Sequence, residues 1–180
     1  VNRLVRWLMV ALLPVMWLSQ AVAIEVTGAP LQGALLFAHT QPGAQVTIDG
    51  HAVRATSDGV FLVGIGRDDI APVVLKAGLP GGGSEQLTLV PQSREYAIQR
   101  IDGLPPGKVS PRSKKVLARI QRDRAAVKQA RRTDDARTDF LQTFAWPVIG
   151  PISGVYGSQR ILNGKPKWPH FGLDIAAPTG

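Results

Sequence analysis

Short apolar runs separated by turn residues fill the first half of this chain, and they constrain its fold more than any other feature. Four such runs lie between Ile24 and Ile101, at residues 34–37, 60–63, 73–75 and 87–90. Glycine, proline or aspartate breaks the pattern at intervals of about 8–12 residues, which is typical of an all-β sandwich. We therefore predict a small antiparallel β-sandwich of about seven strands over residues 24–104.

The clearest turn in this region is Asp49-Gly50, which separates residues 46–48 from 52–53. Asp-Gly is a preferred pair for a type I′ hairpin turn, because both central residues of that turn need a positive φ. His39 and His51 lie in strand or turn surroundings with no partner motif, so we expect both to be surface histidines.

A helix-forming segment follows the β pattern. Leu104-Pro105-Pro106-Gly107 ends that pattern, and Ser110-Pro111 is a pair suited to start a helix. Helix-forming residues then run from Ser113 to about Ala136. We predict a helical linker over residues 105–140.

This predicted linker carries the positive charge of the protein. The whole chain has a formal net charge of +8, and two of its basic residues precede Ile24. Between Arg112 and Asp139 there are ten basic and four acidic residues, a net charge of +6, so the remainder from Ile24 onward is neutral. A solvated linker helix is the simpler interpretation. Contact with an anionic polymer or membrane surface is the alternative.

The first 23 residues have the pattern of a secretory signal peptide. Arg3 and Arg6 precede an apolar run from Trp7 to Leu18, and residues 21–23 place alanines where signal peptidase reads the chain. We predict export with cleavage before Ile24. A membrane anchor would need about 20 apolar residues, and this run is shorter and broken by a proline.

Cysteine is absent from the chain. No disulfide and no thiolate metal site can form, so a metal site would have to use histidines and carboxylates. Nucleic acid is excluded as a partner by the predicted export.

From Phe144 onward, glycine and proline punctuate aromatic and β-branched residues, as in strands joined by tight turns. His170 and Asp174 are candidate metal ligands here, because imidazole nitrogen and carboxylate oxygen both bind Zn²⁺ at about 2.0–2.2 Å. A straight strand would separate their backbones by about 13 Å, so a shared ion needs a bend. The bend costs least at Gly172. On spacing alone, an isolated histidine near an exposed aspartate is the alternative.

The residues around this pair resemble the opening of the lysostaphin-type zinc endopeptidase domain. The similar stretch runs from Trp146-Pro147 through Pro169-His170-Phe171-Gly172-Leu173-Asp174 to Pro178-Thr179-Gly180. In that family a His-x-x-x-Asp motif supplies two zinc ligands, which map onto His170 and Asp174. The resemblance also implies that Arg160 and Asn163 line the substrate groove. More loosely, residues 31–35 and 99–106 resemble the β domain that precedes such catalytic domains in Gram-negative envelope proteins, which implies the periplasm.

The resemblance implies a zinc-dependent endopeptidase of the peptide cross-bridges of peptidoglycan. Family members take a third ligand from a downstream His-x-His motif and use a further catalytic histidine, and neither has a counterpart here. We therefore expect residues 141–180 to be the first strands of an incomplete β-rich peptidase domain, without a catalytic residue, and the chain alone to bind zinc weakly and to be inactive.

Two other functions are open at this point. The chain could belong to a non-catalytic envelope protein that binds peptidoglycan or activates another hydrolase. It could also be a structural β-domain protein whose basic helix binds anionic surface polymers.

Overall fold

The computed structural model describes residues 24–110 and 113–179, and the fold is mainly β, as predicted. The predicted signal peptide, residues 1–23, lies outside the described residues, and so does Pro111 of the predicted helix start.

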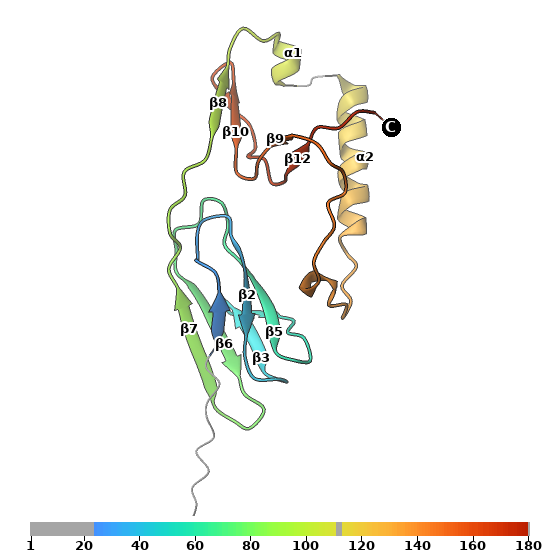
Figure 1. The fold of residues 1–180 in the computed structure, drawn as a ribbon. Helices are drawn as coiled ribbons and strands as arrows, with labels where there is room; N and C mark the ends of the chain where they lie inside the picture. The colour runs from blue at the N-terminus through green and yellow to red at the C-terminus, as the bar shows by residue number, and fades with distance from the viewer. Residues whose placement is uncertain (1–23, 111–112, 180) are drawn as a thin grey trace, which may run out of the picture.

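Two antiparallel sheets form the predicted sandwich (Figure 1). One sheet has the order β1-β2-β5, and the other has the order β4-β3-β6-β7. The strands are β1 (Glu25–Thr27), β2 (Leu35–His39), β3 (Gln45–Ile48), β4 (His51–Val53), β5 (Val60–Gly64), β6 (Val73–Gly78) and β7 (Ser84–Leu89). Their pairing confirms the predicted antiparallel sandwich of seven strands.

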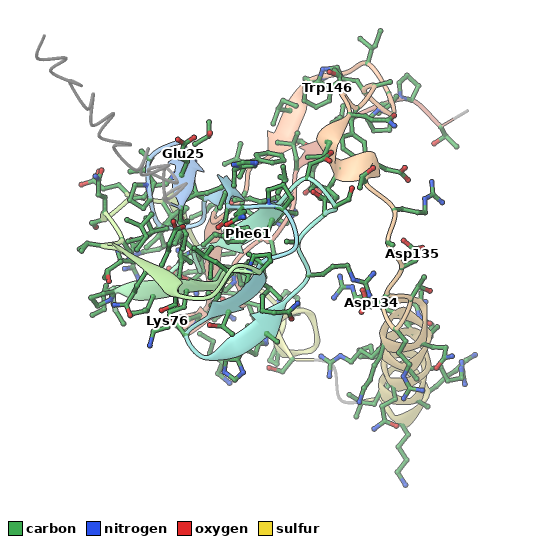
Figure 2. The ribbon with its side chains drawn as sticks, turned by 90° about the horizontal axis from the view of Figure 1, so that it is seen from below. Glu25, Phe61, Lys76, Asp134, Asp135 and Trp146 are labelled. Atoms are coloured by element: carbon green, nitrogen blue, oxygen red, sulfur yellow. The ribbon has the colours of Figure 1, made fainter. Side chains whose placement is uncertain are left out.

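The core of the sandwich follows the two-residue period of a β-strand. In β2, Leu36 and Ala38 are buried while their neighbours Leu35 and Phe37 are exposed. Figure 2 shows Phe61 of β5 inside the sandwich. The largest fully buried side chains are Phe61, Leu75, Val63 and Thr40.

The hairpin between β3 and β4 has the predicted turn. Asp49 and Gly50 have φ values of 49° and 80°, and Ile48 pairs with His51. Both central residues thus have the positive φ that a type I′ turn requires. His51 is exposed, as expected, whereas His39 at the end of β2 is half-buried.

The basic helix is α2 (Lys114–Ala130), and it ends before the predicted limit near Ala136. After Ala130 come Thr133, Asp134 and Asp135, whose side chains compete with the helix for backbone hydrogen bonds. The Asp135 carboxylate accepts a hydrogen bond of 3.0 Å from the Arg137 backbone N–H, an arrangement that replaces the helical one.

No residue of α2 is buried, and the helix stands apart from the sandwich. In Figure 2, Asp134 lies between the end of α2 and the sandwich, where its carboxylate pairs with Arg54 at 3.2 Å. Within residues 24–110 and 113–179, no helix is long and apolar enough to cross a membrane.

The C-terminal part of the chain forms two small sheets. One has the order β11-β10-β8, and the other pairs β12 with β9. The elements here are β8 (Ile98–Ile101), α1 (Pro106–Val109), η1 (Asp139–Leu141), β9 (Ile152–Gly154), β10 (Gln159–Leu162), β11 (Lys165–Pro166) and β12 (Asp174–Ile175).

Strand β8 lies within the predicted β-sandwich domain of residues 24–104, yet it does not pair with either sandwich sheet. It runs parallel to β10, with Ile98 opposite Gln159 and Ile101 opposite Leu162 (Figure 1). The sandwich sheets thus end at Leu89, and the following segment carries the chain into the C-terminal sheet.

Candidate functional site

The predicted bend between His170 and Asp174 is present. The chain bends at Gly172 and then enters β12, where Asp174 pairs with Gly154 of β9. The bend places His170 Nε2 at 3.2 Å from Asp174 Oδ1. The structure therefore brings the two predicted metal ligands together, with about a third of the His170 side chain and most of the Asp174 side chain exposed (32% and 63%).

The other nitrogen of the His170 ring fixes the orientation of the imidazole. Nδ1 lies 3.3 Å from the carbonyl oxygen of Val155, and a carbonyl can only accept a hydrogen bond. When Nδ1 carries the proton of a neutral ring, Nε2 presents its lone pair to Asp174. Two acceptors at this distance repel one another unless a cation, either a proton or a metal ion, lies between them.

The spacing of these two atoms fits shared coordination of a zinc ion. Two ligand atoms of one tetrahedral zinc ion, each at about 2.0–2.1 Å, lie about 3.3 Å from one another. The observed separation of 3.2 Å is close to that value. The Val155 carbonyl corresponds to the outer hydrogen-bond acceptor that zinc-bound histidines generally have. In the described part of the chain, no group of three or more metal-ligating side chains is close enough to hold an ion.

Gly154 makes room for the Asp174 carboxylate. A Cβ atom added to Gly154 would lie 2.6 Å from Asp174 Oδ2, closer than atoms can approach without a shift. The residue at this position of β9 must therefore be glycine for Asp174 to hold its present conformation. The sequence places Gly154 in a strand, where an isolated glycine signals a close approach.

A cavity of about 600 Å³ adjoins the two ligands. Arg160 of β10, which the resemblance assigns to the substrate groove, lies on its wall together with Lys167 and Trp168. Gln99 of β8 also contributes, and its side-chain oxygen accepts a hydrogen bond of 3.2 Å from Arg160 Nε. The lining thus includes two cationic side chains as well as Asp174 and Trp168, and Trp168 is 86% exposed.

Asn163, the second predicted groove residue, does not line this cavity. It has a φ of 47° in the tight turn between β10 and β11, followed by Gly164 with a φ of 72°. Its side chain accepts a hydrogen bond of 3.0 Å from the Leu104 N–H and donates one of 2.7 Å to the Leu104 carbonyl. Asn163 therefore ties the turn to the segment after β8.

Sequence reasoning missed several residues of the site. The contribution of Gln99 depends on parallel pairing between strands far apart in the chain, for which no local signal exists. Lys167 and Trp168 directly precede Pro169-His170 in the sequence. This closeness to a predicted ligand was the only sequence signal that could have placed them at the site. Lys167 also donates a hydrogen bond to the carbonyl of Val109, at the end of α1.

Comparison with known proteins adds no assignment: no protein-family model matches the chain, and no curated protein matches it significantly. The chemistry of the site therefore rests on the residues themselves and on the resemblance of their order to the lysostaphin-type domain.

Proposed function

We propose that this chain is part of an exported zinc endopeptidase that cleaves the peptide cross-links of peptidoglycan. The observation that carries the proposal is the separation of 3.2 Å between His170 Nε2 and Asp174 Oδ1. This pair occupies the His-x-x-x-Asp positions of the stretch that resembles the lysostaphin-type domain. The bend at Gly172 and the space left beside Gly154 allow the two side chains to approach this closely.

Each residue of the site has a definite task in this proposal. His170 and Asp174 hold the zinc ion, and the Val155 carbonyl keeps the imidazole turned toward it. A zinc ion held by these residues would lower the pKa of a bound water and polarise the scissile carbonyl. Arg160, held by Gln99, offers its remaining N–H groups to carboxylates of the peptide substrate. Trp168 offers an exposed face against which the peptide can pack.

A catalytic zinc site would need ligands in addition to His170 and Asp174. A catalytic zinc ion normally has three protein ligands and one open position. The resemblance assigns the third ligand and the catalytic histidines to a segment C-terminal to Gly180. We therefore propose that this chain alone binds zinc weakly and does not hydrolyse peptidoglycan.

Location and partners are proposed from the sequence. Residues 1–23 direct export to the periplasm, where peptidoglycan lies, with cleavage before Ile24. The basic helix α2 is proposed to face an anionic surface of the envelope. Its support is that no residue of the helix is buried, with Val116, Leu117 and Val127 exposed, together with the charge of the linker.

The proposal is tested with the complete protein encoded by the reading frame that contains this chain, loaded with zinc. We expect it to release cleaved cross-links from purified muropeptides, measured by mass spectrometry, and to lose this activity when a chelator is added. Asp174→Asn is expected to lower the rate by at least about 100-fold, because an amide is a poorer ligand than a carboxylate.

The matched control for this variant is Asp102→Asn, which changes an exposed carboxylate outside the cavity and should leave the rate unchanged. Intact cross-links after incubation with the zinc-loaded protein would refute the endopeptidase. If that protein nevertheless sediments with peptidoglycan sacculi, the non-catalytic binding function takes its place.

A further inference from the structure

A single turn holds His170 through three of its atoms. The Gly157 N–H donates a hydrogen bond of 2.7 Å to the His170 carbonyl, and the His170 N–H donates one of 2.8 Å to the Ser158 carbonyl. The third contact is the one between His170 Nδ1 and the Val155 carbonyl, at 3.3 Å. The placement of the imidazole therefore depends on the turn formed by residues 155–158.

This turn keeps its shape through Gly157. The Ser158 N–H donates to the Val155 carbonyl at 3.3 Å, and Gly157 has a φ of 84°, which is the geometry of a type II turn. A Cβ atom added to Gly157 would lie 2.0 Å from the ring of Tyr96. Gly157 is therefore needed both for its backbone conformation and for the contact with Tyr96.

The same turn is also bonded to a loop of the β-sandwich. Arg67, in the loop that follows β5, donates a hydrogen bond of 2.7 Å from Nε to the Gly157 carbonyl. Its side chain is only 10% exposed, and its guanidinium lies over the ring of Tyr96 at 4.5 Å from the centroid. The Tyr96 hydroxyl in turn donates a hydrogen bond of 2.6 Å to the carbonyl of the buried residue Gln32.

The loop that carries Arg67 is fixed by several hydrogen bonds. The Gly66 N–H donates a hydrogen bond of 2.7 Å to the Asp69 carboxylate, and the Gly66 carbonyl accepts one of 3.1 Å from the Gly33 N–H. Gln32 donates from its side chain to the Asp69 carbonyl at 3.1 Å. A planar guanidinium on a loop fixed in this way is suited to hold the Gly157 carbonyl in one position.

We infer that Arg67 is a positioning residue for the zinc site, acting through Gly157 on His170. This inference rests on the proposed function, because it treats His170 as a zinc ligand. Arg67 holds Gly157 by its carbonyl, and Gly157 holds His170 by its N–H. The β-sandwich is thereby a structural part of the metal site, and the affinity of the site for zinc depends on a residue from outside the peptidase-like stretch.

The test measures zinc affinity by competition with a chromophoric chelator, using the chain from Ile24 to Gly180. Arg67→Ala is expected to weaken zinc binding by up to about 10-fold, the lower end of the loss caused by removing an outer-shell partner, because Arg67 acts on His170 only through Gly157. Arg67→Lys keeps a donor but cannot lie flat on the Tyr96 ring, so it should restore part of the affinity. The matched control is Arg54→Ala, whose guanidinium pairs with Asp134 and whose side chain is 51% exposed.

A second readout reports on His170 without zinc. In ¹⁵N NMR spectra at constant pH, the unaltered chain is expected to show a protonated Nδ1, and Arg67→Ala should shift this population toward the other tautomer. A loss of fold stability alone would not change the tautomer at a temperature where the far-UV circular dichroism is unchanged.

Comparing two glycine variants tests the same inference without altering Arg67. Gly157→Ala should displace Tyr96 and weaken zinc binding, whereas Gly164→Ala carries a similar backbone strain in open space and should not. Unchanged zinc affinity and an unchanged His170 tautomer in Arg67→Ala would overturn the inference. If the unaltered chain binds no zinc, the proposal that His170 and Asp174 alone hold the ion fails, and the tautomer measurement still decides whether Arg67 positions His170.

Discussion

Replacing His170 by alanine is expected to lower the affinity of the chain for zinc by at least about 100-fold, because losing an outer-shell partner alone costs about 10–100-fold. His170 is the only histidine that lines the cavity among the described residues. Without it, Asp174 is left as a single, largely exposed carboxylate, and such a group holds a divalent ion mainly through water. Isothermal titration calorimetry with zinc, at fixed pH and ionic strength, measures the change.

The chain supplies its own control for this variant. His39 and His51 are the other histidines of the sequence, and both lie in the β-sandwich. The double variant His39→Ala/His51→Ala should bind zinc as the unaltered chain does. If the double variant loses the binding while His170→Ala keeps it, the metal site has been assigned to the wrong part of the molecule.

The largest expected effect on stability comes from Phe61→Ala. Phe61 is 1% exposed in the centre of the sandwich (Figure 2), and truncating a buried phenylalanine costs about 3–5 kcal/mol through lost burial and the cavity that remains. Phe144→Ala is the matched control, because Phe144 is 74% exposed and lies outside the sandwich. It should change the free energy of unfolding by less than about 0.5 kcal/mol.

Urea unfolding followed by far-UV circular dichroism measures both variants, since no tryptophan lies within the sandwich strands. A loss below about 1 kcal/mol in Phe61→Ala would mean that the two sheets do not pack on this side chain as described.

The sandwich could be predicted because its signals are local. Short apolar runs such as residues 34–37 mark the strands, and Asp49-Gly50 marks a hairpin by its backbone preference alone. The end of α2 was predicted too late because threonine and aspartate side chains take over backbone hydrogen bonds that a helix would otherwise make.

The approach of His170 to Asp174 was also predictable, because both residues and the bend at Gly172 lie in one short stretch. The rest of the site was not, because it depends on contacts between distant segments. Gln99 lines the cavity because β8 pairs in parallel with β10. Arg67 bonds to Gly157, which is 90 residues away in the chain. Asn163 was assigned to the groove by resemblance, while its side chain bonds to the Leu104 backbone instead.

X-ray absorption spectroscopy of the chain with one equivalent of zinc tests the central claim most directly, because it identifies the atoms bound to the metal. The account predicts a zinc spectrum with the scattering signature of one imidazole, which disappears in His170→Ala and persists in His39→Ala/His51→Ala. A spectrum with oxygen ligands alone, or an imidazole signature that survives in His170→Ala, would contradict it.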